Sequence, residues 1–448
     1  MNILIVGAGR IGINLSKSLA DENNDVHLIE QNKDIIDKIN EKLDVKIFWG
    51  SGADPIALKR ADVDTADLVL AVTTSDETNL VVCALASSFG AKRCIARVRS
   101  TSLRDALMSF GGSRFGVNEV INPELVAAEA VVKTVESPGA SEVAEFADGR
   151  VLLRGFDIPE ETSLCGIPLH ELRDEDFPWP FLIVAIVRDR KVIFPTGETS
   201  LQPHDHIYVM LPATSLPEFM SFIDPKTVTP RKVVIFGATI TGARVAKTLS
   251  DRVKNIILIE EDEELAKQMA GELQNVTVLN GTASEADILT ECGIETADTF
   301  IAASQNDHAN FVSSVLAKKM GAKTTIIVTQ QAEYLSLIEA LDIDAIINPH
   351  FLAVEQILHL VRGRGVGTIS KMLECDAEAM ELIPEREAPI TQDILRNVKL
   401  PQNAIVGAVY RGSEVILASG DIQISHGEKV IVFCHHSAAK KLQALFTS

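Results

Sequence analysis

Short apolar runs alternate with segments of helical periodicity along the first 123 residues. Nearly every position of each run is apolar, which is typical of strands buried on both faces of a parallel sheet. The segments between them space apolar residues along one helix face, as Ile35, Ile36 and Ile39 do. This alternation predicts a doubly wound α/β fold. The expected strands cover residues 3–6, 26–30, 45–49, 67–72, 94–98 and 117–121, and helices are expected at 33–43, 76–88 and 124–135.

The pattern changes between residues 140 and 212. Apolar runs there are short, and glycine and proline separate them, which favours a small strand-rich lobe. Four prolines follow, and they predict a linker over residues 213–230. The strands expected in this lobe cover residues 151–156, 181–187, 192–194 and 207–211.

The first pattern begins again at Lys232. Gly237, Gly242 and Glu260 each follow a residue of the same type by 230 positions, and Asn310 follows Asn79 by 231. So many matches in register indicate a tandem duplication of a two-lobe unit. We therefore expect two doubly wound, Rossmann-like parallel sheets, each followed by a small β-rich α+β lobe. The expected lobes are 1–123, 124–212, 231–349 and 350–448, with the linker at 213–230.

Composition narrows the possible partners. The net charge of −20 argues against nucleic acid and against a basic patch for anionic lipid. No apolar run approaches the length of a bilayer span, and the first residues enter a strand at once, so we expect a cytosolic protein without a signal peptide. None of the six cysteines forms a C-x-x-C pair, and no metal site is expected.

A glycine-rich turn follows the first strand. Gly7, Gly9 and Gly12 have G-x-G-x-x-G spacing. The first glycine permits the tight turn, the second lets backbone approach a pyrophosphate, and the third allows close packing of helix on strand. The helix that follows directs its free N–H groups at phosphate. Glu30 ends the next strand, where its carboxylate can accept from a ribose hydroxyl, so NAD is favoured over NADP.

Four segments, at 6–12, 72–79, 95–99 and 407–412, together with the order of the lobes, carry a family resemblance. The chain resembles the TrkA family, the cytosolic regulatory subunits of Trk potassium-uptake systems, whose units are called RCK or KTN domains. The resemblance covers essentially the whole chain. It implies a membrane-embedded potassium-conducting partner, peripheral attachment at the inner face of the plasma membrane, and assembly into a homo-oligomer, either a dimer or a tetrameric ring.

The resemblance also implies that NAD or NADH is sensed, with ATP and ADP as competing ligands. Carried over by position, the first site consists of Gly7, Ala8, Gly9, Arg10, Ile11, Gly12, Glu30, Thr73, Thr74 and Arg97. The two threonines end a parallel strand beside the expected ligand crevice. Arg97 ends the next strand and could pair with a phosphate, although a surface ion pair is the competing interpretation.

The second site departs from this pattern. Its positions are Gly237, Ala238, Thr239, Ile240, Thr241 and Glu260. Thr239 replaces the middle glycine and places a side chain where pyrophosphate would approach. Val328 stands at the position of Arg97, while Ser304 and Gln305 replace the two threonines. The second lobe could therefore bind a nucleotide, or it could be kept only for the geometry of the assembly.

The function favoured by these patterns is a nucleotide-sensing regulatory subunit rather than an enzyme. One alternative is an NAD-dependent dehydrogenase, which needs a proton donor or acceptor facing the nicotinamide. Candidates for that role are few, and their spacing suggests turns: His170, His204, His206 and His426. Another alternative is a nucleotide-sensing regulatory subunit whose partner is a different cation channel or an antiporter.

Overall fold

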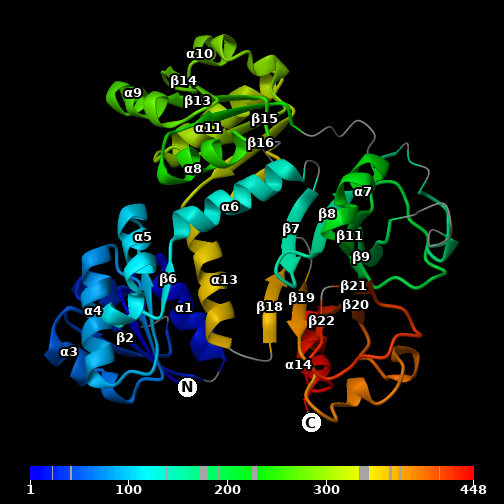
Figure 1. The fold of residues 1–448 in the computed structure, drawn as a ribbon, viewed down its shortest axis with the longest axis horizontal. Helices are drawn as coiled ribbons and strands as arrows, with labels where there is room; N and C mark the ends of the chain where they lie inside the picture. The colour runs from blue at the N-terminus through cyan, green and yellow to red at the C-terminus, as the bar shows by residue number, and fades with distance from the viewer. Residues whose placement is uncertain are drawn as a thin grey trace.

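A computed structural model shows four lobes (Figure 1). It describes residues 1–22, 24–40, 43–137, 140–160, 162, 164–171, 179–189, 191–223, 230–331, 343–362, 366–372, 376–412 and 414–447. Two lobes are α/β and two are rich in antiparallel strands. The predicted fold class, with two Rossmann-like parallel sheets and two small β-rich lobes, is confirmed.

The first lobe has a six-stranded parallel sheet in the order β3-β2-β1-β4-β5-β6. The order reverses between β1 and β4, which is the switch point where ligands bind in open α/β sheets. The strands are β1 (Asn2–Val6), β2 (Asp25–Glu30), β3 (Lys46–Trp49), β4 (Leu68–Ala71), β5 (Cys94–Arg97) and β6 (Glu119–Ile121). The helices are α1 (Arg10–Asp21), α2 (Lys33–Ile39), α3 (Pro55–Arg60), α4 (Asp76–Phe89) and α5 (Thr101–Phe110).

Local signals explain where the helices begin and end. The Ser75 hydroxyl accepts from the backbone N–H of Thr78 and so caps α4, whereas Gly90 closes it with a φ of 102°. The helix expected at residues 33–43 is observed as α2, which is shorter and ends at Ile39. Residues 41–42 lie outside the described part of the chain. Helices α3 and α5 were not expected from the sequence.

The second Rossmann-like lobe repeats the first. Its sheet has the order β14-β13-β12-β15-β16-β17. The strands are β12 (Lys232–Phe236), β13 (Asn255–Glu260), β14 (Val276–Asn280), β15 (Thr299–Ala302), β16 (Thr324–Val328) and β17 (Ala345–Ile347), and the helices are α8 (Ile240–Leu249), α9 (Glu263–Glu272), α10 (Ala286–Glu291) and α11 (Asp307–Lys319). Even polar contacts recur: Asp67 accepts from the N–H of Asn2, and Asp298 accepts from that of Lys232.

Each small lobe contains a five-stranded antiparallel sheet. The first has the order β10-β9-β11-β8-β7 and the second β18-β19-β22-β20-β21. Their inner faces share one core, in which the rings of Tyr208 and Phe433 lie 5.7 Å apart. The strands are β7 (Ala140–Phe146), β8 (Val151–Asp157), β9 (Leu182–Arg188), β10 (Lys191–Ile193), β11 (His206–Pro212), β18 (Val366–Lys371), β19 (Ala377–Leu382), β20 (Ala404–Arg411), β21 (Glu414–Leu417) and β22 (Lys429–His435). The short helix α14 (Ala439–Gln443) packs on the second sheet.

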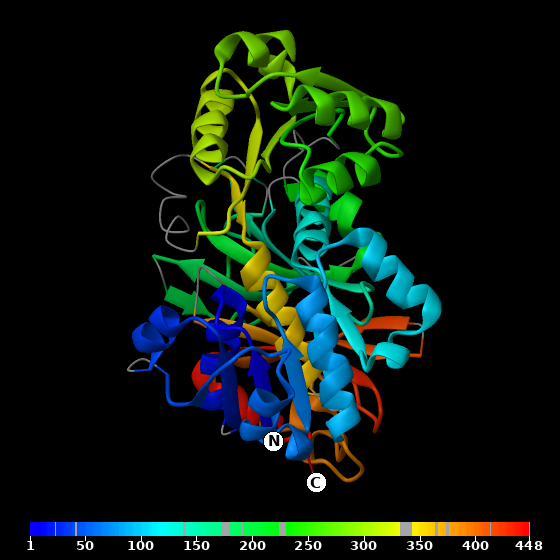
Figure 2. The ribbon, with the colours of Figure 1, turned by 90° about the vertical axis from the view of Figure 1, so that its left-hand side faces the viewer.

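The two units exchange the helix that follows each Rossmann-like sheet. Helix α6 (Pro123–Glu136) leaves the first sheet and buries Val131 and Val135 in the core of the second Rossmann-like lobe. Helix α13 (Pro349–Arg362) leaves the second sheet and buries Val354 and Ile357 against α1 and the first sheet. Both views of the ribbon show these two helices between the lobes (Figures 1 and 2). Each Rossmann-like core is therefore completed by the other repeat.

The stretch expected as a linker, residues 213–230, is partly helical. Helix α7 (Leu216–Ile223) buries Phe219 in the core of the first small lobe, where its ring packs 5.4 Å from that of Phe156. Residues 224–229 of the expected linker lie outside the described part of the chain. Among the described helices, none has the length and apolar character needed to cross a bilayer.

Candidate functional site

The turn between β1 and α1 needs glycine at two positions for its own geometry. Gly7 has a φ of +106°, a conformation that side chains with a Cβ rarely adopt. A Cβ on Gly12 would lie 1.9 Å from the carbonyl oxygen of Gly7, so helix and strand could not approach as they do. These two glycines explain the fold of the turn, and they would be needed whether or not the site binds a ligand.

Gly9 is different, because no contact within the described part of the chain requires a glycine there. Its φ of −72° suits any residue, and a Cβ built on it would meet no atom of the described residues within 4 Å. As the N-cap of α1 it offers no side chain to the helix, and the first turn of α1 contains no acidic residue. The end of the helix that attracts anions is therefore left open and accessible to phosphate. The space beside Gly9 is large enough for a ligand to approach the backbone closely.

Glu30 lies beside this turn at the end of β2. It is only 9% exposed, and its carboxylate accepts from the backbone N–H groups of Ala8 and Asn32, each at 2.7 Å. These bonds hold the carboxylate at the carboxyl edge of the sheet. An ionised carboxylate can accept about four hydrogen bonds, so two acceptor positions remain for ribose hydroxyls.

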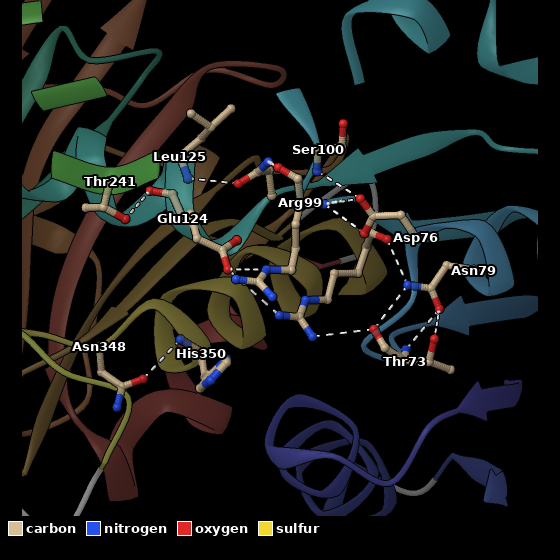
Figure 3. A network of polar contacts seen from close by, with 12 residues as sticks. Thr73, Asp76, Asn79, Arg99, Ser100, Glu124, Leu125, Thr241, Asn348 and His350 are labelled. Atoms are coloured by element: carbon tan, nitrogen blue, oxygen red, sulfur yellow. Dashed lines mark hydrogen bonds and ion pairs between the residues drawn. The ribbon is translucent and has the colours of Figure 1, made fainter. Parts of the chain in front are cut away.

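Thr73 and Arg97 are joined by a buried amide. The side-chain oxygen of Asn79 accepts from the Thr73 N–H and hydroxyl at 2.9 and 2.7 Å, and its nitrogen donates to the carbonyls of Thr73 and Arg97 at 3.2 and 2.8 Å. Asn79 is fully buried, and its position on α4 ties the ends of β4 and β5 together (Figure 3). Thr74 lies exposed at the same edge.

Arg97 is paired with a carboxylate, as one interpretation of the sequence suggested, but the pair is largely buried and not at the surface. Arg97 is 7% exposed, donates to the Thr73 carbonyl at 3.4 Å, and lies 3.9 Å from the Glu124 carboxylate. Arg99 makes the closer pair with Glu124, at 2.7 Å from Nε to Oε1. Within the described residues, Arg97 Nε and Glu124 Oε2 are buried without a hydrogen-bond partner. Arg97 thus keeps donor capacity that an anion could use.

The second repeat places His350 near Arg97 and Glu124, where its backbone bonds to Asn348 (Figure 3). This histidine is the second residue of α13, its N–H donates to the Asn348 side chain at 3.0 Å, and its Nδ1 is buried without a partner among the described residues. Burial, helped by the nearby positive charges of Arg97 and Arg10, lowers the pKa of His350 to about 4. Burial also lowers the pKa of Arg97, although Glu124 opposes that shift. His350 is therefore neutral at pH 7.

Two further contacts connect the first site to the second repeat. Arg10, at the start of α1, donates to the backbone carbonyl of Gln330 at 2.5 Å. The Thr241 hydroxyl, on α8, donates to the carbonyl of Glu124 at 3.1 Å. Ile11 is buried in the core that α13 completes. The carboxyl edge of the first sheet is therefore in direct contact with residues more than 100 positions away in the chain.

The second site has the same backbone geometry as the first, but different side chains occupy it. Gly237 has a φ of +97°, and Glu260 accepts from the Ala238 N–H at 2.6 Å, as Glu30 does from Ala8. Thr239 occupies the position of Gly9. Its hydroxyl accepts from the Gly242 N–H at 3.2 Å and donates to the Ala303 carbonyl at 2.7 Å.

The Thr239 side chain thus caps the N-terminus of α8, whereas the N-terminus of α1 has no side-chain cap. Asn310 repeats the bonds of Asn79, to Ser304 and to the carbonyl of Val328, but no guanidinium follows. Ile240 is half-buried at the first position of α8, and Gln305 is exposed at the position of Thr74.

The histidines weighed as proton donors all lie in the small lobes. His170 and His426 contact backbone carbonyls through Nδ1, at 2.9 and 2.8 Å. His206 lies 2.7 Å from the Asp157 carboxylate, and His204 lies 3.3 Å from that of Glu160. Each has a local partner on its own lobe. Within the described part of the chain, no cluster of three or more histidine, cysteine or acidic side chains is arranged for a metal.

Sequence reasoning pointed to the glycine turn, Glu30 and Arg97, which the structure places at the carboxyl edge of the first sheet, but it did not assign roles to Asn79, Glu124 or His350. Asn79 could have been found, because it recurs as Asn310 in the duplication. His350 could not, since its contact with the first site depends on the exchange of helices between the repeats.

Two domain families match the chain, each twice. The TrkA-N domain matches residues 3–123 and 233–349, and the TrkA-C domain matches 153–224 and 383–447. These matches alternate along the chain, as the tandem duplication predicts.

Relatives of known name match over the full length. The chain is 31% identical to the "Trk system potassium uptake protein TrkA homolog 1" of Methanosarcina mazei, with 100% of both chains covered. It is 30% identical to the "Trk system potassium uptake protein TrkA" of Haemophilus influenzae, over 97% of this chain and 95% of the relative.

A solved structure described as "GsuK channel bound to NAD" is similar in fold. The TM-score is 0.62 at 17% identity, over 99% of this chain and 78% of the other. At that identity the likeness shows the arrangement of lobes alone.

Proposed function

Since the chain belongs to the TrkA family of Trk potassium-uptake proteins, we propose that it is a regulatory subunit that binds NAD or NADH in its first Rossmann-like lobe. Occupancy of that site would favour one placement of the lobes, and a membrane-embedded potassium-conducting partner would respond to it. ATP and ADP would compete for the same site, because they share the adenosine diphosphate part of the ligand.

One observation carries the proposal: Gly9 has no role in the protein's own packing. The open space at its Cβ and the uncapped start of α1 together favour a bound pyrophosphate. Glu30 would accept from the adenosine ribose hydroxyls, and it would disfavour the 2′-phosphate of NADP by charge repulsion. Arg97 supports the assignment because its buried Nε still lacks an acceptor among the described residues.

The contacts between repeats provide a route for regulation. Arg10 follows the phosphate turn directly, and its guanidinium now binds the Gln330 carbonyl of the second repeat. A phosphate group near Arg10 would compete for that guanidinium and would change the balance between placements of the lobes. A ligand shifts such an equilibrium only by the difference between its affinities for the two placements.

The second site is expected to bind a nucleotide more weakly or in another pose. Thr239 fills the helix N-terminus, and Val328 cannot pair with phosphate. Gly237, Ala238, Ile240, Thr241 and Glu260 keep the backbone of the cradle, so the site remains a candidate for a ligand without pyrophosphate.

The partner, the assembly and the location follow from the family. We expect association with a membrane-embedded potassium transporter at the inner face of the plasma membrane. The names of the relatives, which are potassium-uptake proteins, favour a regulatory role over an enzymatic one. A dimer or a tetrameric ring of this chain would present several first sites to one partner.

Calorimetric titration of NAD, NADH, ATP and ADP tests the proposal. Wild-type protein should bind NADH without converting it, and Gly9→Asp should abolish binding, since a carboxylate would occupy the phosphate position. Glu30→Ala should weaken NADH binding about tenfold through the lost ribose contacts. Unchanged affinity in both variants, or turnover of NADH with common metabolites at an enzymatic rate, would contradict the proposal.

A further inference from the structure

One large aromatic side chain lies exposed beside the first site. Trp49 ends β3 and is 54% exposed, whereas the strands of this sheet otherwise end in buried or half-buried side chains such as Val6 and Glu30. Exposed indole surface at the carboxyl edge of a parallel sheet is costly in water and lies where ligands bind. The site described above assigns no role to this residue.

The register of the sheet places the indole next to the ribose acid. Strands β2 and β3 are parallel, and Trp49 pairs with Glu30 in register, so both side chains leave the sheet on the same face. Neighbouring strands lie about 4.8 Å apart. Trp49 is thus one strand further from the phosphate turn than Glu30 is.

This layout follows the order of groups in a nucleotide. The turn for phosphate follows β1, the acid for ribose ends β2, and the indole ends β3, in the sheet order β3-β2-β1. In adenosine diphosphate the base is joined to the ribose on the side away from the phosphates. A nucleotide with its phosphates at α1 and its ribose at Glu30 would therefore extend its base toward β3.

Two contacts fix the orientation of the indole. Its Nε1–H donates to the Gln31 carbonyl at 3.1 Å, and the Lys33 ammonium lies 4.2 Å from the ring centroid. Because these contacts restrict the ring before any ligand arrives, stacking costs little further side-chain entropy. The ammonium covers one face of the ring, so a base would stack on the other face.

The second repeat lacks this feature. Asn280 pairs with Glu260 in the same register, and its amide donates to the carbonyls of Glu260 and Glu261 at 2.9 and 3.1 Å. It offers no aromatic face. The aromatic side chain thus occurs in the repeat that also has the open α1 terminus and Arg97.

We propose that Trp49 stacks on the adenine ring of the nucleotide in the first site and so contributes to the affinity for adenine nucleotides. The inference rests on the proposed function, since it deepens the description of the same site. Aromatic side chains stack on the bases of nucleic acids in the same way, because every base has a π face. Each such contact contributes measurably to the binding free energy.

Calorimetry with ADP and NADH as probes tests the contact. Trp49→Ala should weaken both ligands about five- to tenfold, and Trp49→Phe should remain within about threefold of wild type. Phe110→Ala is the matched control: this residue, 66% exposed at the far end of α5, is also a large exposed aromatic side chain, and its loss should change neither affinity. Thermal unfolding of each variant shows whether it is folded.

Fluorescence supplies an independent readout, because the chain contains two tryptophans. The other, Trp179, lies in the first small lobe with its ring 5.3 Å from that of Phe222. In the Trp179→Phe background, saturating ADP should change the emission of Trp49 with the midpoint that calorimetry gives. In Trp49→Phe the emission should not respond.

The outcomes separate the two proposals. If wild type binds ADP and Gly9→Asp does not, while Trp49→Ala binds within twofold of wild type and the Trp49 emission is constant, the adenine contact is refuted and the sensor proposal stands. If wild type binds neither ADP nor NADH, both are refuted. A five- to tenfold loss in Trp49→Ala with a matching emission change supports the contact.

Discussion

Replacing Gly9 by threonine would place in the first site the N-cap side chain that the second site has. The backbone accepts the change, because Gly9 has φ and ψ of −72° and −176°, and Thr239 has −64° and 171° at the equivalent N-cap. The new Cβ meets no atom within 4 Å. The new hydroxyl should accept from the Gly12 N–H, as that of Thr239 accepts from Gly242.

The two effects of this substitution should differ greatly in size. An N-cap threonine in place of glycine changes stability by only a few tenths of a kcal/mol. For the ligand, the side chain would occupy the phosphate position and remove two charge-assisted hydrogen bonds from the helix N-terminus. At about 1.5 kcal/mol each, their loss amounts to about 3 kcal/mol, or about a 100-fold rise in the Kd for NADH.

Calorimetry and thermal unfolding of Gly9→Thr measure both effects on one sample. We expect an unchanged Tm in the absence of nucleotide, and loss of the rise in Tm that NADH gives the wild type. The reciprocal variant Thr239→Gly is the control, and it should leave the first site's affinity unchanged. If Gly9→Thr bound NADH within threefold of wild type, the argument that Gly9 exists for a phosphate would be wrong.

Other perturbations address the remaining parts of the site. Glu30→Gln removes the repulsion of a 2′-phosphate, so the preference for NAD over NADP in calorimetry should fall about tenfold; an unchanged ratio would exclude Glu30 from ribose recognition. Asn79→Ala removes four buried hydrogen bonds and should cost about 3 kcal/mol in urea unfolding and about tenfold in NADH affinity, whereas Asn310→Ala should cost similar stability and no affinity.

Ile357→Ala in α13 should lower the free energy of unfolding by about 3 kcal/mol. Hydrogen exchange should show reduced protection in the first sheet and not in the second. The opposite pattern would contradict the exchange of helices between the repeats. The pKa of His350 is about 4 in the folded state and about 6.5 in the unfolded state, so protonation favours the unfolded state. The free energy of unfolding should therefore fall by about 2 kcal/mol as the pH drops from 6.5 to 4. His350→Asn should make the free energy of unfolding depend less on pH over this range.

The sequence was sufficient for features that local rules determine. Apolar runs marked the buried strands, because parallel strands covered by helices on both faces are apolar at nearly every position. Gly90 marked the end of α4 because only glycine adopts the left-handed conformation there without strain. The spacing of Gly7 and Gly12 gave the turn, since a side chain at either position would collide with backbone across it.

The exchange of helices could not be predicted in the same way. The periodicity of α6 and α13 indicates that each has an apolar face to bury, with Val131 on one and Ile357 on the other. Because the two Rossmann-like lobes are copies, each offers a nearly equivalent surface to either helix. The choice depends on the path of the chain between lobes, which no local pattern encodes. The same holds for α7: the prolines between residues 212 and 230 indicated a linker, although Phe219 of this helix is buried.

The duplication gives one chain two sites that need not remain equivalent. His350 stands at the position that Glu124 has in the first repeat, since each follows an Asn-Pro pair before its exchanged helix. Two copies of one repeat would bring two acids to this edge, whereas the fused chain brings one acid and one neutral histidine beside Arg97. The charge at the edge of the first sheet is therefore less negative than a symmetric assembly would make it, which favours an anionic ligand there. The substitutions that distinguish the second site, Thr239 and Val328, thus lie in the same repeat as His350.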